Sequence, residues 1–210
     1  MSRFAVHWIL ITVPCLALLS PIHMMRGAGG IVNFVGCLEF VLLNNFVFSV
    51  LAVSAAAFGQ EWLLAWHRRP ARRWWAFMTA GAVVSWIANY GFTDQVLPWF
   101  MQAGSYETRL MVVSRSLCDG IAFGTAAALA LWGRAWPAVA RPWLAGVIGL
   151  YTLKAVLHVL LITLLGSPRN TDSPLAWSIA LMAFDALVVS SGTALWLERL
   201  ILKPAPETVA

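Results

Sequence analysis

Charged residues are scarce in this chain of 210 residues. Only 11% of the residues are Asp, Glu, Lys or Arg, whereas about a quarter is usual in a soluble domain. Hydrophobic residues make up 60% and the mean hydropathy is +0.77. This composition excludes an ordinary soluble protein, and the ten-residue alternation typical of transmembrane β-strands is also missing. The chain is therefore predicted to be an integral membrane protein in contact with the lipid bilayer.

Cysteine is also rare, and Cys15, Cys37 and Cys118 show no spacing typical of a disulfide framework or a metal site. A P-loop and an HExxH pair are missing as well. The formal net charge is +5, but the basic residues gather at the ends of apolar segments. We therefore expect no metal, no cofactor and no nucleic-acid partner.

Six apolar segments have roughly the length that crosses a bilayer as a helix, about 20 residues. They cover residues 5–25, 31–60, 74–93, 109–132, 142–166 and 174–200. We predict an all-α, polytopic transmembrane bundle in one domain, 1–210, with antiparallel neighbours because the loops are short. Apolar character in the second segment persists to Trp66, which leaves open whether this helix tilts, breaks near Asn44 and Asn45, or continues along the interface.

Basic residues set the expected orientation, because Lys and Arg concentrate in cytoplasmic loops. Those assigned to one side are Arg3, Arg68, Arg69, Arg72, Arg73, Arg134, Arg141, Arg199 and Lys203. Those assigned to the other side are Arg26, Arg109 and Arg169. Both termini are therefore predicted to be cytoplasmic, in an inner membrane, with the first segment retained as a helix.

Tryptophan supports this orientation, because it favours the boundary between lipid and water. The tryptophans near the predicted cytoplasmic boundary are Trp8, Trp62, Trp66, Trp74, Trp75, Trp132, Trp136, Trp143 and Trp196. We interpret them as an interfacial belt.

Polar side chains inside the predicted spans are the candidate functional site. Each charge at bilayer depth costs about 2.5 to 3.5 kcal/mol, so such residues must be paired or hydrated. Placed by helical rise, they converge between the midplane and the outer face. The expected site residues are Glu39, Asn44, Asn45, Asn89, Arg115, Asp119, Tyr151, Lys154, His158 and Asp185. Because the second helix is polar on several sides, we expect it at the centre of the bundle.

Spacing predicts which of these side chains share a helix face. Arg115 and Asp119 are four residues apart and can pair, and Tyr151, Lys154 and His158 form a second stripe. The cluster contains more carboxylates than fixed cations, so we hypothesise that a protonated His158 or a bound cation restores neutrality.

The first functional hypothesis is a membrane protein that binds or transports a small solute or ion through a polar site open to the outer side. Secondary transporters bind their substrates near the midplane, where this cluster is predicted to lie. A cation or a zwitterion suits the mixed charges. Without a nucleotide-binding signature, transport would use a gradient or a partner subunit.

The second hypothesis is an integral enzyme with Glu39 and Asp185 as acid and base on a lipid-soluble substrate. The segment NFVGCLEF (Asn33–Phe40) resembles the Asn-x-x-Trp-Glu segment of small membrane-bound terpene cyclases, over these residues alone and with Leu38 at the tryptophan position. The resemblance implies an isoprenoid or terpenoid substrate, with one acid in an early helix and another in the last.

Two further hypotheses stay open. His23 and His158 lie toward one side and His7 and His67 toward the other, a distribution that can supply axial ligands to b-type haems. Alternatively, the chain is an accessory subunit that acts with a partner subunit or as a homo-oligomer.

Overall fold

The computed structural model describes residues 2–19, 38–67, 73–91, 106–132, 136–165 and 174–199. Throughout these residues the regular structure is helical, which confirms the predicted all-α class. The helices are α1 (Arg3–Leu19), α2 (Leu38–Trp66), α3 (Trp74–Ala88), α5 (Tyr106–Trp132), α6 (Trp136–Leu165) and α7 (Pro174–Leu197).

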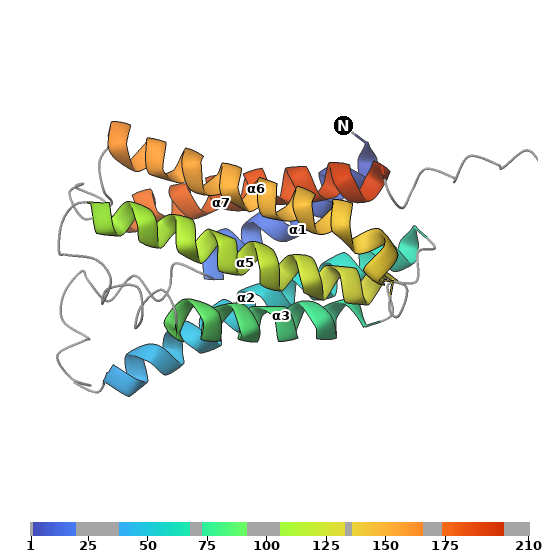
Figure 1. The fold of residues 1–210 in the computed structure, drawn as a ribbon, viewed down its shortest axis with the longest axis horizontal. Helices are drawn as coiled ribbons and strands as arrows, with labels where there is room; N and C mark the ends of the chain where they lie inside the picture. The colour runs from blue at the N-terminus through green and yellow to red at the C-terminus, as the bar shows by residue number, and fades with distance from the viewer. Residues whose placement is uncertain are drawn as a thin grey trace, which may run out of the picture.

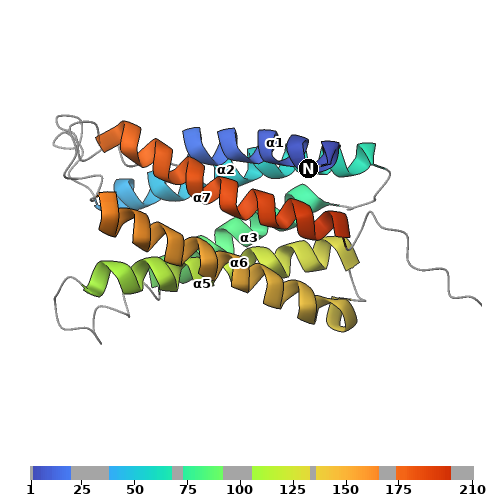
Figure 2. The ribbon, with the colours of Figure 1, turned by 90° about the horizontal axis from the view of Figure 1, so that it is seen from above.

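The helices form a closed ring in chain order. Each packs against the next, from α1 with α2 to α6 with α7, and α7 packs against α1. Successive helices run in opposite directions (Figures 1 and 2). The two ends of the described chain lie together, because Ser2 Oγ donates a 2.7 Å hydrogen bond to Glu198 Oε2. The result is an up-and-down bundle with its first and last helices side by side.

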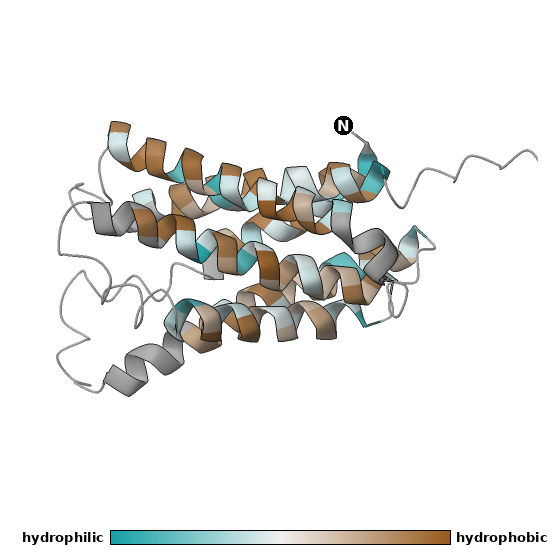
Figure 3. Ribbon diagram, in the orientation of Figure 1, coloured by the Kyte–Doolittle hydropathy of each residue, from teal (hydrophilic) through white to brown (hydrophobic). Residues whose placement is uncertain are grey.

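Four segments are long and apolar enough to cross a membrane: Phe46–Trp66, Val112–Trp132, Pro142–Leu165 and Ile179–Leu197. The first predicted span corresponds to a shorter apolar helix, Arg3–Ala17, and the third to α3, whose 15 residues continue into a π-helical turn over residues 89–91. Apolar residues recur along the helices, with few hydrophilic interruptions (Figure 3). This architecture is compatible with a membrane protein, with four candidate spans within the described residues where six were predicted.

The expectation that the second helix is central is wrong. α2 packs against α1 and α3 as one member of the ring, and its outward face leaves Phe58 69% and Trp62 61% exposed. Polar residues in its described part bond to a neighbouring helix, as in the 2.9 Å hydrogen bond between Ser54 and Thr79. The helix is continuous through positions 44 and 45 up to Trp66, so the alternative of a break there is also wrong.

Tryptophans form part of the core at the end of the ring where the described chain starts and finishes. Trp8, Trp74 and Trp143 are buried, so the predicted interfacial belt is only partly correct. Burial is possible because the indole N–H groups of two of them find partners inside the protein, such as the carbonyl of Gly124, 3.0 Å from Trp143 Nε1. The tryptophans that remain exposed here are Trp62, Trp66, Trp75 and Trp196.

Small residues bring α3, α5 and α6 close together. A Cβ atom on Gly81 of α3 would lie 2.9 Å from the Cβ of Ala126 on α5. A Cβ atom on Gly120 of α5 would lie 3.1 Å from the Cβ of Tyr151 on α6. Glycine at these positions lets the backbones approach, and the polar side chains of the three helices meet as a consequence.

Candidate functional site

A cavity of about 440 Å³ lies inside the ring, and all six helices contribute to its wall. The contributing residues recur every three or four positions, as a single face of a helix requires. On α6 they are Trp143, Val147, Tyr151, Lys154 and His158. The volume falls within the range of small-molecule sites, about 300 to 1,000 Å³.

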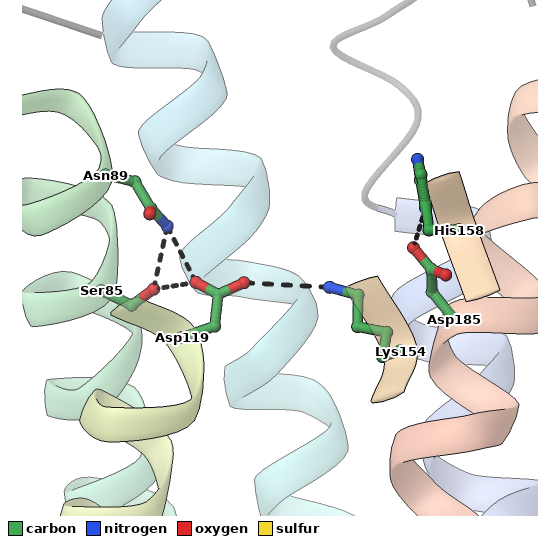
Figure 4. Close-up of polar contacts among 6 residues, drawn as sticks. All are labelled: Ser85, Asn89, Asp119, Lys154, His158 and Asp185. Atoms are coloured by element: carbon green, nitrogen blue, oxygen red, sulfur yellow. Dashed lines mark hydrogen bonds and ion pairs between the residues drawn. The ribbon is translucent and has the colours of Figure 1, made fainter. Parts of the chain in front are cut away.

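Asp119 is the centre of one polar group, on α5 facing α3. Its Oδ1 atom accepts a short hydrogen bond from Ser85 Oγ and a 2.8 Å hydrogen bond from Asn89 Nδ2 (Figure 4). Asn89 Nδ2 also lies 3.3 Å from Ser85 Oγ. Ser85 and Asn89 are four residues apart and so project from the same face of α3. Two donors therefore fix the orientation of this carboxylate.

Lys154 approaches the same carboxylate from α6. Its Nζ atom lies 4.0 Å from Asp119 Oδ2 and 5.6 Å from the ring centroid of Tyr151. The ammonium group is thus in ionic contact with Asp119 at a distance longer than a good hydrogen bond. The predicted stripe of Tyr151, Lys154 and His158 does face one space, because all three contribute to the cavity wall.

His158 and Asp185 form a second polar group, between α6 and α7. His158 Nδ1 lies 2.6 Å from Asp185 Oδ2, and the two residues are 9% and 6% exposed. Both belong to the cavity wall, and Figure 4 shows this pair beside the Asp119 group. With Asp185 ionised, Nδ1 donates the hydrogen bond and Nε2 remains as the second nitrogen of the ring.

Three residues of the cavity wall each have one buried polar atom with no hydrogen-bond partner among the described residues. The atoms are Asp185 Oδ1, Asn89 Oδ1 and Trp8 Nε1. A buried polar atom without a partner costs about 1 to 3 kcal/mol, so each is a point where a ligand with the complementary group gains binding energy. The two oxygens are acceptors at the end of the cavity that holds Asp119, Lys154 and the His158–Asp185 pair, which we call the charged end. The indole N–H is a donor among the buried tryptophans.

A third polar group, which the sequence analysis missed, lies at the tryptophan end. Trp74 Nε1 donates to Gln60 Oε1 at 2.9 Å, Gln60 Nε2 donates to Thr12 Oγ1 at 2.8 Å, and Thr12 Oγ1 donates to the carbonyl of Trp8 at 2.7 Å. Gln60 stands next to Glu61 near the end of its apolar run, and no role was predicted for it. Its placement one turn after Ala56, on the apolar face of α2, is the signal that identifies it as buried.

The structure brings most of the predicted site residues to one cavity. Those that contribute to its wall are Asn89, Arg115, Asp119, Tyr151, Lys154, His158 and Asp185. Arg115 is more exposed than the rest and makes contacts of its own. The partners described for Asp119 come from the neighbouring helices, and its pairing with Arg115 on the same helix stays a prediction.

The side chains of Glu39, Asn44 and Asn45 lie outside the described residues, although their backbones belong to α2. Phe46 packs against Trp86 with ring centroids 5.0 Å apart, at the level where α3 approaches Asp119. Glu39 precedes Phe46 by seven residues, which places its backbone about 10 Å further along the helix axis. The side-chain position of Glu39 is not described, so its place in the site stays a prediction.

The described histidines do not form the predicted haem ligand pairs. His158 is bonded to Asp185, while His7 stacks on Trp66 and His67 packs against Phe4 at the exposed end of the ring; His23 lies outside the described residues. In the described part of the chain no group of three or more His, Cys, Asp or Glu residues is placed to hold a metal ion. Compared with protein-family models, curated proteins and solved structures, this chain has no match.

Proposed function

We propose that this chain is a multi-pass inner-membrane protein that binds a small solute with a cationic, N–H-donating group in the central cavity and carries it across the membrane. The observation that carries this proposal is the hydrogen bonding of the Asp185 carboxylate. Its Oδ2 atom is held by His158, whereas its buried Oδ1 atom has no partner among the described residues. A carboxylate oriented in this way is an acceptor prepared for a charged donor.

The neighbouring groups favour a donor over an anion. Asn89 Oδ1 is a second unpartnered acceptor in the described part of the same cavity wall, and an anion would meet the carboxylates of Asp119 and Asp185. A primary ammonium group carries three N–H donors, enough for both oxygens. Because Lys154 lies as far as 4.0 Å from Asp119, it can also receive the carboxylate of a zwitterion.

The proposed orientation of the protein in the membrane rests on the distribution of its basic residues. Arg3, Arg73 and Arg199 lie at the end of the ring where the described chain starts and finishes, and basic residues favour the cytoplasmic side. The Asp185 end of the cavity would then open outward. Since the sequence has no nucleotide-binding signature, an ion gradient or a partner subunit would drive transport.

Thermal unfolding of the purified protein tests the proposal. n-Butylammonium has N–H donors, whereas tetramethylammonium has the same charge and none. We expect n-butylammonium to raise the melting temperature more than tetramethylammonium does at equal concentration and ionic strength. The difference should disappear in Asp185→Asn and persist in Glu198→Gln, a control carboxylate bonded to Ser2. Equal responses to both cations, or an unchanged difference in Asp185→Asn, would contradict the proposal.

A second candidate, an acid–base enzyme acting on a lipid-soluble substrate, is favoured by one observation. A carboxylate on Nδ1 of a histidine orients the ring so that Nε2 can exchange a proton with a substrate, and the contact between His158 and Asp185 has this form. In this candidate His158 and Asp185 would act as the acid and base, the roles that the sequence suggested for Glu39 and Asp185. Conversion of a prenyl alcohol by the purified protein, abolished by His158→Gln, would favour this candidate over solute binding.

A further inference from the structure

Trp8 differs from the other buried tryptophans of the core. Trp74 Nε1 donates to Gln60 and Trp143 Nε1 donates to the carbonyl of Gly124. Trp8 is only 2% exposed, yet its Nε1 atom has no partner among the described residues. Its ring packs edge-on against Trp74, with centroids 5.7 Å apart. Packing accounts for the burial of the ring but leaves the N–H group without a role.

The polar groups beside Trp8 do not supply the missing acceptor. The hydrogen bonds from Trp74 to Gln60, from Gln60 to Thr12 and from Thr12 to the Trp8 carbonyl all run in one direction. The oxygens of Gln60 and Thr12 are therefore already engaged by this chain. Trp8 itself contributes to the cavity wall, so an acceptor carried by a ligand would have to approach Nε1 from the cavity.

The spacing along α3 estimates how far Trp8 lies from the polar group of Asp119, beside which the His158–Asp185 pair lies (Figure 4). Trp8 contacts Trp74 at the first residue of α3, and Ser85 of the same helix contacts Asp119. Trp74 and Ser85 are eleven residues apart, about 16 Å along the helix. A space of about 440 Å³ extended over that length is narrow. Between its two ends the wall includes Val147, Ala186 and Val189, which are apolar.

From these relationships we infer that Trp8 forms a second subsite, and that the ligand is an elongated, amphipathic amine with an uncharged hydrogen-bond acceptor at its far end. The ammonium group binds at Asp185, the apolar body occupies the middle of the cavity, and a hydroxyl, ether or carbonyl oxygen accepts from Trp8 Nε1. This inference rests on the proposed function, because it takes the ammonium site at Asp185 as its other end. An uncharged acceptor is specified because the basic side chains of the described cavity wall, Arg115, Lys154 and His158, belong to the charged end.

Calorimetric titration with two amines of equal length tests the inference. The probes are n-octylammonium and 8-hydroxyoctylammonium, which differ only in the terminal hydroxyl. One hydrogen bond of about 0.5 to 1.5 kcal/mol corresponds to roughly a 2- to 13-fold tighter dissociation constant for the hydroxylated amine in the wild-type protein. Trp8→Phe should abolish this preference without weakening n-octylammonium, and Trp75→Phe, an exposed tryptophan at the same end, should retain it. Partition of the amines into detergent is common to all three proteins and cancels from the comparison.

A shorter pair of probes keeps the test decisive if Trp8→Phe does not fold. If the ligand spans the distance of about 16 Å estimated along α3, the hydroxyl of 4-hydroxybutylammonium falls short of Trp8, so it should gain less over n-butylammonium in the wild-type protein than the longer pair does. If n-octylammonium binds in a manner that depends on Asp185 but the terminal hydroxyl confers no preference, the Trp8 subsite is refuted and the proposed function stands. If neither amine depends on Asp185, the proposed function itself fails and the second subsite fails with it.

Discussion

His158 on α6 and Asp185 on α7 are joined by a contact of 2.6 Å between Nδ1 and Oδ2, and both side chains are buried. This contact links two neighbouring helices of the ring and fixes which carboxylate oxygen is left for the cavity. In the proposed function the contact therefore serves both stability and ligand binding. The two roles can be tested separately, because stability should depend on the pair whereas ligand binding should depend on the second oxygen of Asp185.

Removing one member of this pair is expected to destabilise the protein more than replacing both. His158→Leu leaves a buried carboxylate without its partner, which typically costs about 3 to 5 kcal/mol in the free energy of unfolding. The double variant His158→Leu/Asp185→Leu removes both polar groups and should lose less than His158→Leu alone. Denaturation in detergent, followed by circular dichroism, measures the losses in His158→Leu, in Asp185→Leu and in the double variant relative to the wild type. Additive losses would show that the contact contributes no coupling energy.

Close approach of α3 and α5 should be sensitive to one methyl group. In Gly81→Ala the new Cβ would lie 2.9 Å from the Cβ of Ala126, an atom attached directly to the backbone, so the helices must separate. Overpacking of this kind costs about 1 to 3 kcal/mol. Gly149→Ala is the matched control, since its new Cβ would meet no described atom within 4 Å, and it should unfold at or slightly above the wild-type temperature. Equal melting temperatures for the two variants would refute the tight contact.

The hydrogen bonds at the tryptophan end predict a specific loss for Gln60→Leu. Leucine has a similar volume but removes the acceptor of Trp74 Nε1 and the donor to Thr12 Oγ1. Leaving buried polar groups without partners costs about 1 to 3 kcal/mol for each group. The variant should therefore unfold at a lower temperature than Gln60→Glu, in which an oxygen still accepts from Trp74. The reverse order would contradict the role of Gln60 as an acceptor.

Topology can be tested in cells with reporters fused before Ser2 and after Ala210. The contact between Ser2 and Glu198 places both ends of the described chain on one side of the ring, and the distribution of arginine predicts that this side is cytoplasmic. Both fusions should therefore report the cytoplasm. A cysteine introduced at Leu164, at the opposite end of α6, should react with a membrane-impermeant thiol reagent from outside. Reporters on opposite sides would contradict an even number of crossings.

The sequence predicted features that depend on one helix at a time. The i, i+3, i+7 spacing placed Tyr151, Lys154 and His158 on one face, because helical periodicity is local. Which neighbour each side chain meets depends on how helices are arranged in the ring, and a single sequence does not contain that information. For this reason the spacing could suggest a pairing of Asp119 with Arg115 on its own helix but could not predict its contacts with Ser85, Asn89 and Lys154.

The helical type of the described elements was predicted correctly, whereas the limits of the second helix were not. The second span was predicted at residues 31–60, whereas the described part of α2 runs over Leu38–Trp66. Gln60, the last residue of the predicted span, is buried within this helix. Hydrophobicity does not set these limits sharply when apolar residues continue beyond the helix.

The most direct test of ligand binding at Asp185 is the dissociation constant of n-butylammonium, measured by calorimetry on the purified wild-type protein, Asp185→Asn and Glu198→Gln. A hydrogen bond to a charged group contributes about 1.5 to 3 kcal/mol, so Asp185→Asn should bind at least about tenfold more weakly while Glu198→Gln matches the wild type. Equal affinities in the wild type and Asp185→Asn would contradict the assignment of the cavity as the binding site of a cationic solute.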